Sequence, residues 1–166
     1  MTLYDDVYGA LAAAEVRFVV VGGMAVVLSG HVRATVDLDV VVDLDPEPAR
    51  RAMTALTELG FRPRVPVAPL DFADPAVRRE WIETKNMQVL SFYDPQRVAR
   101  EVDVFVAYPI DFARLIAASV PTPVGDRVVR VAAICDLLEM KRAAGRPQDL
   151  ADVAALERLQ ELRADG

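Results

Sequence analysis

The segment of residues 19–43, VVVGGMAVVLSGHVRATVDLDVVVD, constrains the fold of this chain more than any other. Its β-branched run stops at Gly22-Gly23, which predicts a strand that ends in a tight turn. A short buried helix over residues 24–28 follows the turn. Over residues 37–45 aspartates alternate with leucines and valines, so this stretch predicts a strand with one acidic and one apolar face.

Two aspartates of this strand, Asp37 and Asp39, define a candidate metal site. In a strand their Cα atoms lie roughly 6.5–7 Å apart, and their like charges repel unless a cation lies beside them. Magnesium prefers oxygen ligands from one or two carboxylates, from waters and from substrate phosphates, so the pair suits a nucleotide site. The alternative is a solvent-facing acidic strand in which Arg33 is the counter-ion.

The glycine pair gives this candidate site a second component. Where a strand turns into a helix, backbone N–H groups without helical partners can bind a phosphate, and glycine lets the ligand approach closely. Gly22-Gly23 alone is weak evidence, since many tight turns use the same pair. At a short fixed distance from Asp37 and Asp39, however, the pair favours a nucleotide-binding site.

The rest of the chain alternates between expected helices and strands, without an internal repeat. Thr2 and Asp5 resemble a capping box at the start of a first helix that reaches about Ala14. Residues 61–80 contain several prolines and mixed charge, and they predict a loop with one helical turn over residues 76–81. The other expected elements are strands over 17–21, 87–93, 102–108 and 127–131, helices over 46–59, 111–118, 132–144 and 147–162, and a break at Pro121-Thr-Pro123.

At 166 residues the chain is expected to form one domain, 1–166, whose core needs no disulfide or metal. We expect an α/β (α+β) fold in which helices flank a small mixed β-sheet and a helical pair closes the C-terminal side. Residues 1–120 then hold the sheet-containing core, and residues 121–166 hold the last strand and the helical pair.

Composition limits the binding partners and the cellular location that we expect for the protein. The formal net charge of −6 argues against indiscriminate binding to nucleic-acid phosphates, although paired arginines leave a specific contact open. Charged residues interrupt every apolar run before the ~18 residues of a spanning helix, so no membrane partner is expected. The acidic N-terminal residues do not resemble a secretory signal and the single Cys135 suits a reducing compartment, so we expect a cytoplasmic protein.

Lys141 lies on the face of its expected helix that points toward the core. Ile134, Leu137 and Leu138 precede it with the spacing of one apolar face, and Lys141 completes that face at i+7. The lysine either binds a phosphate or extends to solvent near the helix C-terminus, where the helix dipole favours a cation.

The glycine turn and the acidic strand together form a pattern, GGMA at 22–25, GH at 30–31 and RATVDLD at 33–39. This pattern resembles the signature of the polymerase β-type nucleotidyltransferase superfamily. More narrowly it resembles the AbiEii-type branch, which contains toxins of bacterial and archaeal toxin–antitoxin systems. A looser match covers residues 102–104 and 141–149, so most of the chain has a counterpart. The resemblance implies a nucleotidyltransferase fold.

The resemblance also implies a metal site. Asp37 and Asp39 would bind Mg²⁺, or Mn²⁺ in its place, and Asp103 on a neighbouring strand would complete the carboxylate set. Glu101 shares a strand face with Asp103 and is the alternative third carboxylate. All three aspartates are therefore candidate catalytic residues.

The resemblance assigns nucleotide binding to a second group of residues. Gly22 and Gly23 would hold the phosphates, and Lys141 would be a further phosphate ligand. Arg33 and Asp149 complete this set, although Arg33 can instead pin its loop and Asp149 can instead cap or neutralise its helix. The residue after the glycines is a methionine where Thr or Ser is often found, so a hydroxyl contact to phosphate is missing.

The implied activity is transfer of a nucleoside monophosphate from a nucleoside triphosphate to an acceptor hydroxyl, with release of pyrophosphate. In toxin members of the resembled family the acceptor can be the 3′ end of tRNA, and a cognate antitoxin is then a partner. In other branches the acceptor is a protein side chain or an aminoglycoside. Two alternatives stay open, a non-catalytic nucleotide- or partner-binding module on the same fold and a purely structural acidic strand.

Overall fold

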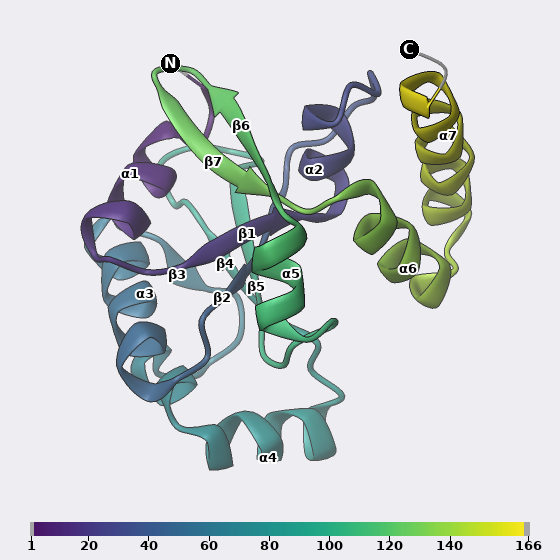
Figure 1. Ribbon diagram of the computed structural model, residues 1–166. Coiled ribbons are helices and arrows are strands. Elements are labelled where there is room, and N and C mark those ends of the chain that lie inside the picture. Colours follow the sequence, from purple (N-terminus) through teal and green to yellow (C-terminus); the bar gives the residue numbers. More distant parts are fainter. Residues whose placement is uncertain (1, 165–166) are drawn as a thin grey trace.

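The computed structural model describes residues 2–164, and the strands form one seven-stranded mixed sheet in the order β3-β4-β5-β2-β1-β7-β6 (Figure 1). The strands are β1 (Phe18–Val21), β2 (Leu38–Val42), β3 (Arg62–Pro63), β4 (Val89–Tyr93), β5 (Glu101–Phe105), β6 (Val120–Val124) and β7 (Arg127–Val131). The helices are α1 (Asp5–Ala13), α2 (Gly22–Leu28), α3 (Pro46–Glu58), the 3₁₀ helix η1 (Pro69–Ala73), α4 (Pro75–Lys85), α5 (Phe112–Ala118), α6 (Ile134–Ala144) and α7 (Pro147–Ala164). The expected mixed sheet flanked by helices is confirmed.

The central strands β1, β2 and β5 carry the candidate site. Strands β1 and β2 are antiparallel, with Val21 opposite Asp39, whereas β2 and β5 are parallel, with Asp39 opposite Asp103. Because β2 begins at Leu38, Asp37 lies just before the hydrogen-bonded ladder. The acidic strand is therefore shorter than the alternation suggested, and only one of its two candidate metal ligands belongs to the sheet.

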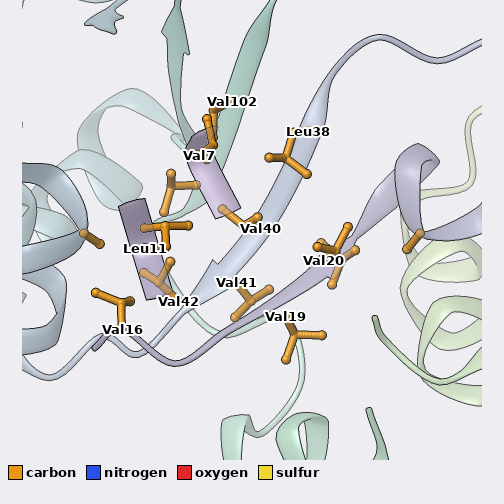
Figure 2. Close-up of a cluster of buried hydrophobic side chains, with 14 of the residues drawn as sticks. Val7, Leu11, Val16, Val19, Val20, Leu38, Val40, Val41, Val42 and Val102 are labelled. Atoms are coloured by element: carbon orange, nitrogen blue, oxygen red, sulfur yellow. The ribbon is translucent and has the colours of Figure 1, made fainter. Parts of the chain in front are cut away.

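The main core lies between the sheet and the N-terminal helices. Figure 2 shows Val7 and Leu11 of α1 beside Val40 and Val42 of β2, and all four side chains are buried. Each such side chain contributes roughly 1.5–3 kcal/mol when it is fully buried. Since side chains alternate along a strand, this packing directs Asp39 to the opposite face of the sheet, where it stays partly exposed.

The expected capping box at the N-terminus is wrong. Helix α1 begins after Tyr4 without a side-chain cap, and the Thr2 hydroxyl is buried with no hydrogen-bond partner. Tyr4 is instead one of the largest fully buried side chains. The start of the helix is thus set by burial of this aromatic ring rather than by a polar cap.

The proline-rich segment 61–80 is also more regular than expected, because it contains β3, η1 and the start of α4. Pro75 occupies the first turn of α4, where a missing N–H costs nothing. The Asp74 carboxylate accepts a hydrogen bond from the Ala76 N–H at 2.8 Å and caps the helix. The same prolines that suggest a loop therefore begin a helix of eleven residues.

The break expected at Pro121-Thr-Pro123 is part of a strand. These residues lie in β6, which pairs antiparallel with β7 at one edge of the sheet. An edge strand can hold prolines where the missing N–H would face away from the neighbouring strand.

The C-terminal helical pair is confirmed as α6 and α7, which lie on the α2 side of the molecule in Figure 1. Gly145 ends α6 with a φ of +65°, and Pro147 opens α7, as expected for a hinge. Within residues 2–164 no helix combines the length and the apolar character that a membrane crossing needs.

Candidate active site

The parallel pairing of β2 and β5 brings two candidate metal ligands side by side. Asp39 and Asp103 are register partners on neighbouring strands, so their side chains leave the same face of the sheet. Asp37 precedes β2 and is exposed, yet its charge still acts on both of these carboxyl groups. Glu101 lies on the same strand face as Asp103 but is held by Arg64 in an ion pair. The geometry thus favours Asp103 over Glu101 as the partner of Asp39.

The electrostatics of this carboxylate pair favour a cation. Burial, the largest effect, and the neighbouring Asp103 together raise the pKa of Asp39 to about 7, against the opposing effects of Lys141 and Arg146. Burial also raises the pKa of Asp103, while the Ser91 hydroxyl acts in the opposite direction. Asp103 Oδ1 is buried and has no hydrogen-bond partner among the described residues. Two partly buried carboxylates without a close counter-charge are a donor set that fits Mg²⁺.

The number of ligands fits magnesium better than a closed metal cage. Among residues 2–164, no three His, Cys, Asp or Glu side chains converge closely enough to surround an ion. A cation at Asp39 and Asp103 would therefore complete its shell with waters and substrate oxygens, as Mg²⁺ does in nucleotide sites.

The glycine turn lies directly against the acidic strand. Gly22 has a φ of +64°, and a Cβ at this position would lie 2.6 Å from Asp39 Cγ. A Cβ at Gly23 would lie 2.7 Å from Thr35 Oγ1 and would also overlap the Arg33 guanidinium. Any other residue at either position would displace side chains of the candidate site, so both glycines are needed for the packing around Asp39.

Lys141 belongs to a buried ion network. Its Nζ lies 3.0 Å from Asp149 Oδ1 and 3.0 Å from Asp152 Oδ2, and these two aspartates are at most 1% exposed. Arg146 Nε lies 2.6 Å from Asp149 Oδ2, and Arg33 Nε lies 3.2 Å from Asp152 Oδ1. The network therefore ties α6 and α7 to the loop that precedes β2.

This network of ion pairs carries a surplus of positive charge. Burial raises the pKa of Asp149, but the hydrogen bonds from Arg146 and Lys141 outweigh it and lower the pKa to about 2. Three cations surround two carboxylates, so one positive charge remains uncompensated. Lys141 and Arg146 both act on the pKa of Asp39, so this surplus charge lies near the carboxylate pair.

The structure corrects the alternative in which Arg33 is the counter-ion of the acidic strand. Arg33 pairs with Asp152, not with Asp37 or Asp39. Asp152 and Arg146 are members of the network that sequence reasoning missed. The i, i+3 spacing of Asp149 and Asp152, which places both on one face of α7, is the signal that could have found Asp152.

On the other side of Asp103 the face of the sheet continues onto β4. Ser91 is the register partner of Asp103, and Tyr93 is the register partner of Glu101. The Arg64 guanidinium lies 5.3 Å from the centre of the Tyr93 ring and also binds Glu101. This side of the site therefore offers an aromatic ring and mixed charge, opposite the glycine turn.

A cavity of about 420 Å³ lies elsewhere, between α4 and the other ends of β2 and β5. Leu44, Arg78 and Tyr108 are among its lining residues, and none of the candidate site residues is. The candidate active site is therefore separate from this cavity.

The strand order, the glycine turn against one aspartate and the second aspartate on the neighbouring parallel strand define the fold class. The chain has the nucleotidyltransferase fold. No protein-family model and no curated protein sequence matches the chain. The assignment therefore rests on likeness to solved structures.

Three of these solved structures are similar along nearly the whole chain. The crystal structure of the lincosamide antibiotic adenylyltransferase LnuA with lincomycin bound has a TM-score of 0.62 at 15% identity, covering 92% of this chain and 93% of that one. ANT(2″)-Ia in complex with adenylyl-2″-tobramycin has a TM-score of 0.57 at 16% identity, covering 98% and 94%. An antigenic nucleotidyltransferase-like protein from Paracoccidioides brasiliensis has a TM-score of 0.53 at 16% identity, covering 96% and 78%. At these identities the likeness establishes the fold.

Proposed function

We propose that this protein is a Mg²⁺-dependent nucleotidyltransferase, which moves a nucleoside monophosphate from a nucleoside triphosphate to an acceptor hydroxyl and releases pyrophosphate. The observation that carries this proposal is the register pairing of Asp39 with Asp103 directly beside the glycine turn. The fold shared with two antibiotic adenylyltransferases supports the same reaction class.

The carboxylates have distinct roles in this proposal. Asp39 and Asp103, which are register partners, would hold the ion, and the exposed Asp37 would be a third ligand once substrate is bound. Mg²⁺, or Mn²⁺ in its place, would supply positive charge that neutralises the phosphoryl group during transfer. In this account Asp103, whose pKa burial raises, also accepts the proton of the acceptor hydroxyl as the general base.

The triphosphate lies on the side of the glycine turn in this proposal. Backbone N–H groups of Gly22 and Gly23, at the start of α2, donate hydrogen bonds to phosphate oxygens, as unpaired N–H groups at a helix N-terminus can. The surplus positive charge of the buried network, which includes Arg33 and Lys141, attracts the phosphates electrostatically. Asp149 contributes indirectly, since it holds Lys141 in place.

Two acceptor classes follow from different observations. The resemblance of the segment 19–43 to AbiEii-type sequences supports the 3′ end of tRNA as the acceptor, with the protein acting as a toxin that a cognate antitoxin restrains. The likeness to enzymes whose names specify lincosamide and tobramycin chemistry supports a hydroxylated antibiotic as the second candidate.

The test is a transfer assay with each α-³²P-labelled nucleoside triphosphate and Mg²⁺, in which total tRNA, an aminoglycoside and a lincosamide are offered separately. The Asp103→Asn variant should lose transfer by at least about a hundredfold, since it loses both a metal ligand and the proton acceptor. Asp126→Asn is the matched control, because Asp126 lies exposed in the turn between β6 and β7. Label on RNA, on an antibiotic or on the protein itself identifies the acceptor class.

Two results would contradict the proposal. If wild type and Asp103→Asn transferred label equally, the carboxylate pair would not be the reaction centre. If the wild type bound Mg²⁺ and triphosphate in calorimetry but transferred no label, the non-catalytic nucleotide-binding module would be the better account.

A further inference from the structure

Tyr4 joins the two segments that carry Asp37 and Asp103, although it lies far from both in the sequence. Its hydroxyl accepts a hydrogen bond from the Glu101 N–H at 3.0 Å. The same hydroxyl lies 2.7 Å from the Glu101 carbonyl oxygen and contacts the Val36 carbonyl oxygen, and it can donate its proton to either. Val36 directly precedes Asp37, and Glu101 is two residues before Asp103 on the same face of β5.

The Tyr4 ring is held in one orientation. It is only 1% exposed, and the Arg100 guanidinium lies 5.4 Å from its centre. Arg100 is itself buried. Two contacts hold it in place, because its Nε donates to the Leu3 carbonyl at 3.0 Å and its Nη1 binds Asp94 at 2.9 Å. Burial, the largest effect, raises the pKa of Tyr4 to about 12, so the hydroxyl keeps its proton at neutral pH.

The sheet alone does not position Asp37. The pairing of β2 with β5 begins at Leu38 opposite Val102, so the residues before Leu38 lie outside the ladder. The loop of residues 31–37 is therefore tied at Arg33, through Asp152, and at Val36, through Tyr4. Only the second of these ties connects the loop to the strand that bears Asp103.

We propose that Tyr4 is a positioning residue, whose hydroxyl fixes the Asp37 loop against β5 so that Asp37 stays beside the pair Asp39 and Asp103. Its effect on catalysis depends on the proposed nucleotidyl transfer, whereas its effect on the spacing of the two segments does not. Tyr4 touches neither substrate nor metal in this account, because its side chain is buried beneath the site.

Tyr8 provides a matched control. It is also buried, at 2% exposed, and it lies one helical turn after Tyr4. Its hydroxyl makes no hydrogen bond with any described residue, so Tyr8→Phe removes an oxygen without removing a connection. Tyr4→Phe removes the same atom together with the link between Val36 and Glu101.

Three measurements on the full chain test the proposal, each comparing Tyr4→Phe with Tyr8→Phe and wild type. Hydrogen exchange followed by NMR should show the Glu101 amide exchanging about tenfold faster in Tyr4→Phe, because its acceptor is gone. Mn²⁺ affinity, measured by electron paramagnetic resonance with a non-hydrolysable triphosphate analogue bound, should fall about five- to tenfold, because Asp37 joins the metal site in that state. In the transfer assay kcat should fall about tenfold while KM for the triphosphate stays unchanged, since the phosphates lie on the glycine side.

Each outcome decides the proposal. Equal Glu101 exchange and equal Mn²⁺ affinity in Tyr4→Phe and Tyr8→Phe would overturn it. If wild type neither bound Mn²⁺ nor transferred label, the proposed function would fail, and the exchange data alone would still decide whether Tyr4 fixes the two segments. If Tyr4→Phe did not fold, the wild-type spectrum would decide, because a clamped Tyr4 hydroxyl proton exchanges slowly and shows a cross-peak to the Glu101 amide, and absence of that resonance would refute the clamp.

Discussion

Replacing Asp39 by asparagine should stabilise the metal-free protein while abolishing its activity. Asp39 has a pKa of about 7 in the folded chain, against 3.8 for a free carboxyl, so holding it ionised at pH 8 costs the folded state up to about 4 kcal/mol at 1.36 kcal/mol per pH unit. Because the side chain is partly exposed, solvent screening reduces this cost to about 2 kcal/mol. Asparagine has nearly the same shape and no charge, so the variant avoids the cost.

The sign of the pH dependence follows from the raised pKa. The folded state binds the Asp39 proton more tightly than the unfolded state, so wild-type stability without metal falls as pH rises from about 4 to 7. Asp39→Asn should therefore be about 2 kcal/mol more stable than wild type at pH 8 and nearly equal to it at pH 4. Adding Mg²⁺ at pH 8 should stabilise wild type and leave Asp39→Asn unchanged.

The assay is urea unfolding in the presence of a chelator at pH 4 and pH 8, with Asp126→Asn as the exposed control. A variant that is equally or less stable than wild type at pH 8 would refute the view that burial and the charge of Asp103 disfavour an ionised Asp39 in the folded protein.

Other perturbations act on the glycine turn and on the buried network. Lys141→Met leaves Asp149 undercompensated in the interior and should lower the free energy of unfolding by about 3–5 kcal/mol, measured by urea unfolding at pH 7. Gly22→Ala and Gly125→Ala should both lower stability, since both glycines have a positive φ, but only Gly22→Ala should abolish Mn²⁺ binding, because its methyl group overlaps Asp39. Acid should remove about 2 kcal/mol of stability as pH falls from 4 to 2, because the lowered pKa of Asp149 makes its contribution present only above that range, and Asp149→Asn should remove this pH dependence.

These predictions have their own controls and contrary outcomes. Lys85→Met, at an exposed lysine, should change stability by less than about 0.5 kcal/mol, and a similar loss in both lysine variants would deny Lys141 a special role. Intact Mn²⁺ binding in Gly22→Ala would show that the turn tolerates a side chain beside Asp39. An Asp149→Asn variant that unfolds in acid like wild type would place the acid sensitivity elsewhere in the chain.

Local patterns in the sequence were sufficient for the glycine turn, for the placement of Asp39 and for all the strands except β3 and β6. Alternation with a period of two identifies the buried and exposed faces of β2 without knowledge of its neighbours. The glycine pair marks the point where β1 becomes α2, although the helix begins at Gly22 itself rather than at Met24. These features depend on residues close together in the chain, and a local pattern can encode them.

The parts of the site that depend on distant contacts were harder to predict. Asp103 was found only through the family resemblance, since nothing in its own segment indicates that β5 pairs with β2. Tyr4 carried no signal, because an aromatic residue at the start of a helix reads as core and its partner Glu101 lies 97 residues away. The role of Arg33 was open for the same reason, because its partner Asp152 belongs to the last helix.

The prolines of β3 and β6 have a consequence for how copies of this protein meet one another. Both outer strands of the sheet contain proline, at Pro63 on one side and at Pro121 and Pro123 on the other. An outer strand normally offers unpaired N–H groups to which a strand of another molecule can add, and proline removes them. The prolines thereby disfavour growth of the sheet edge to edge into aggregates.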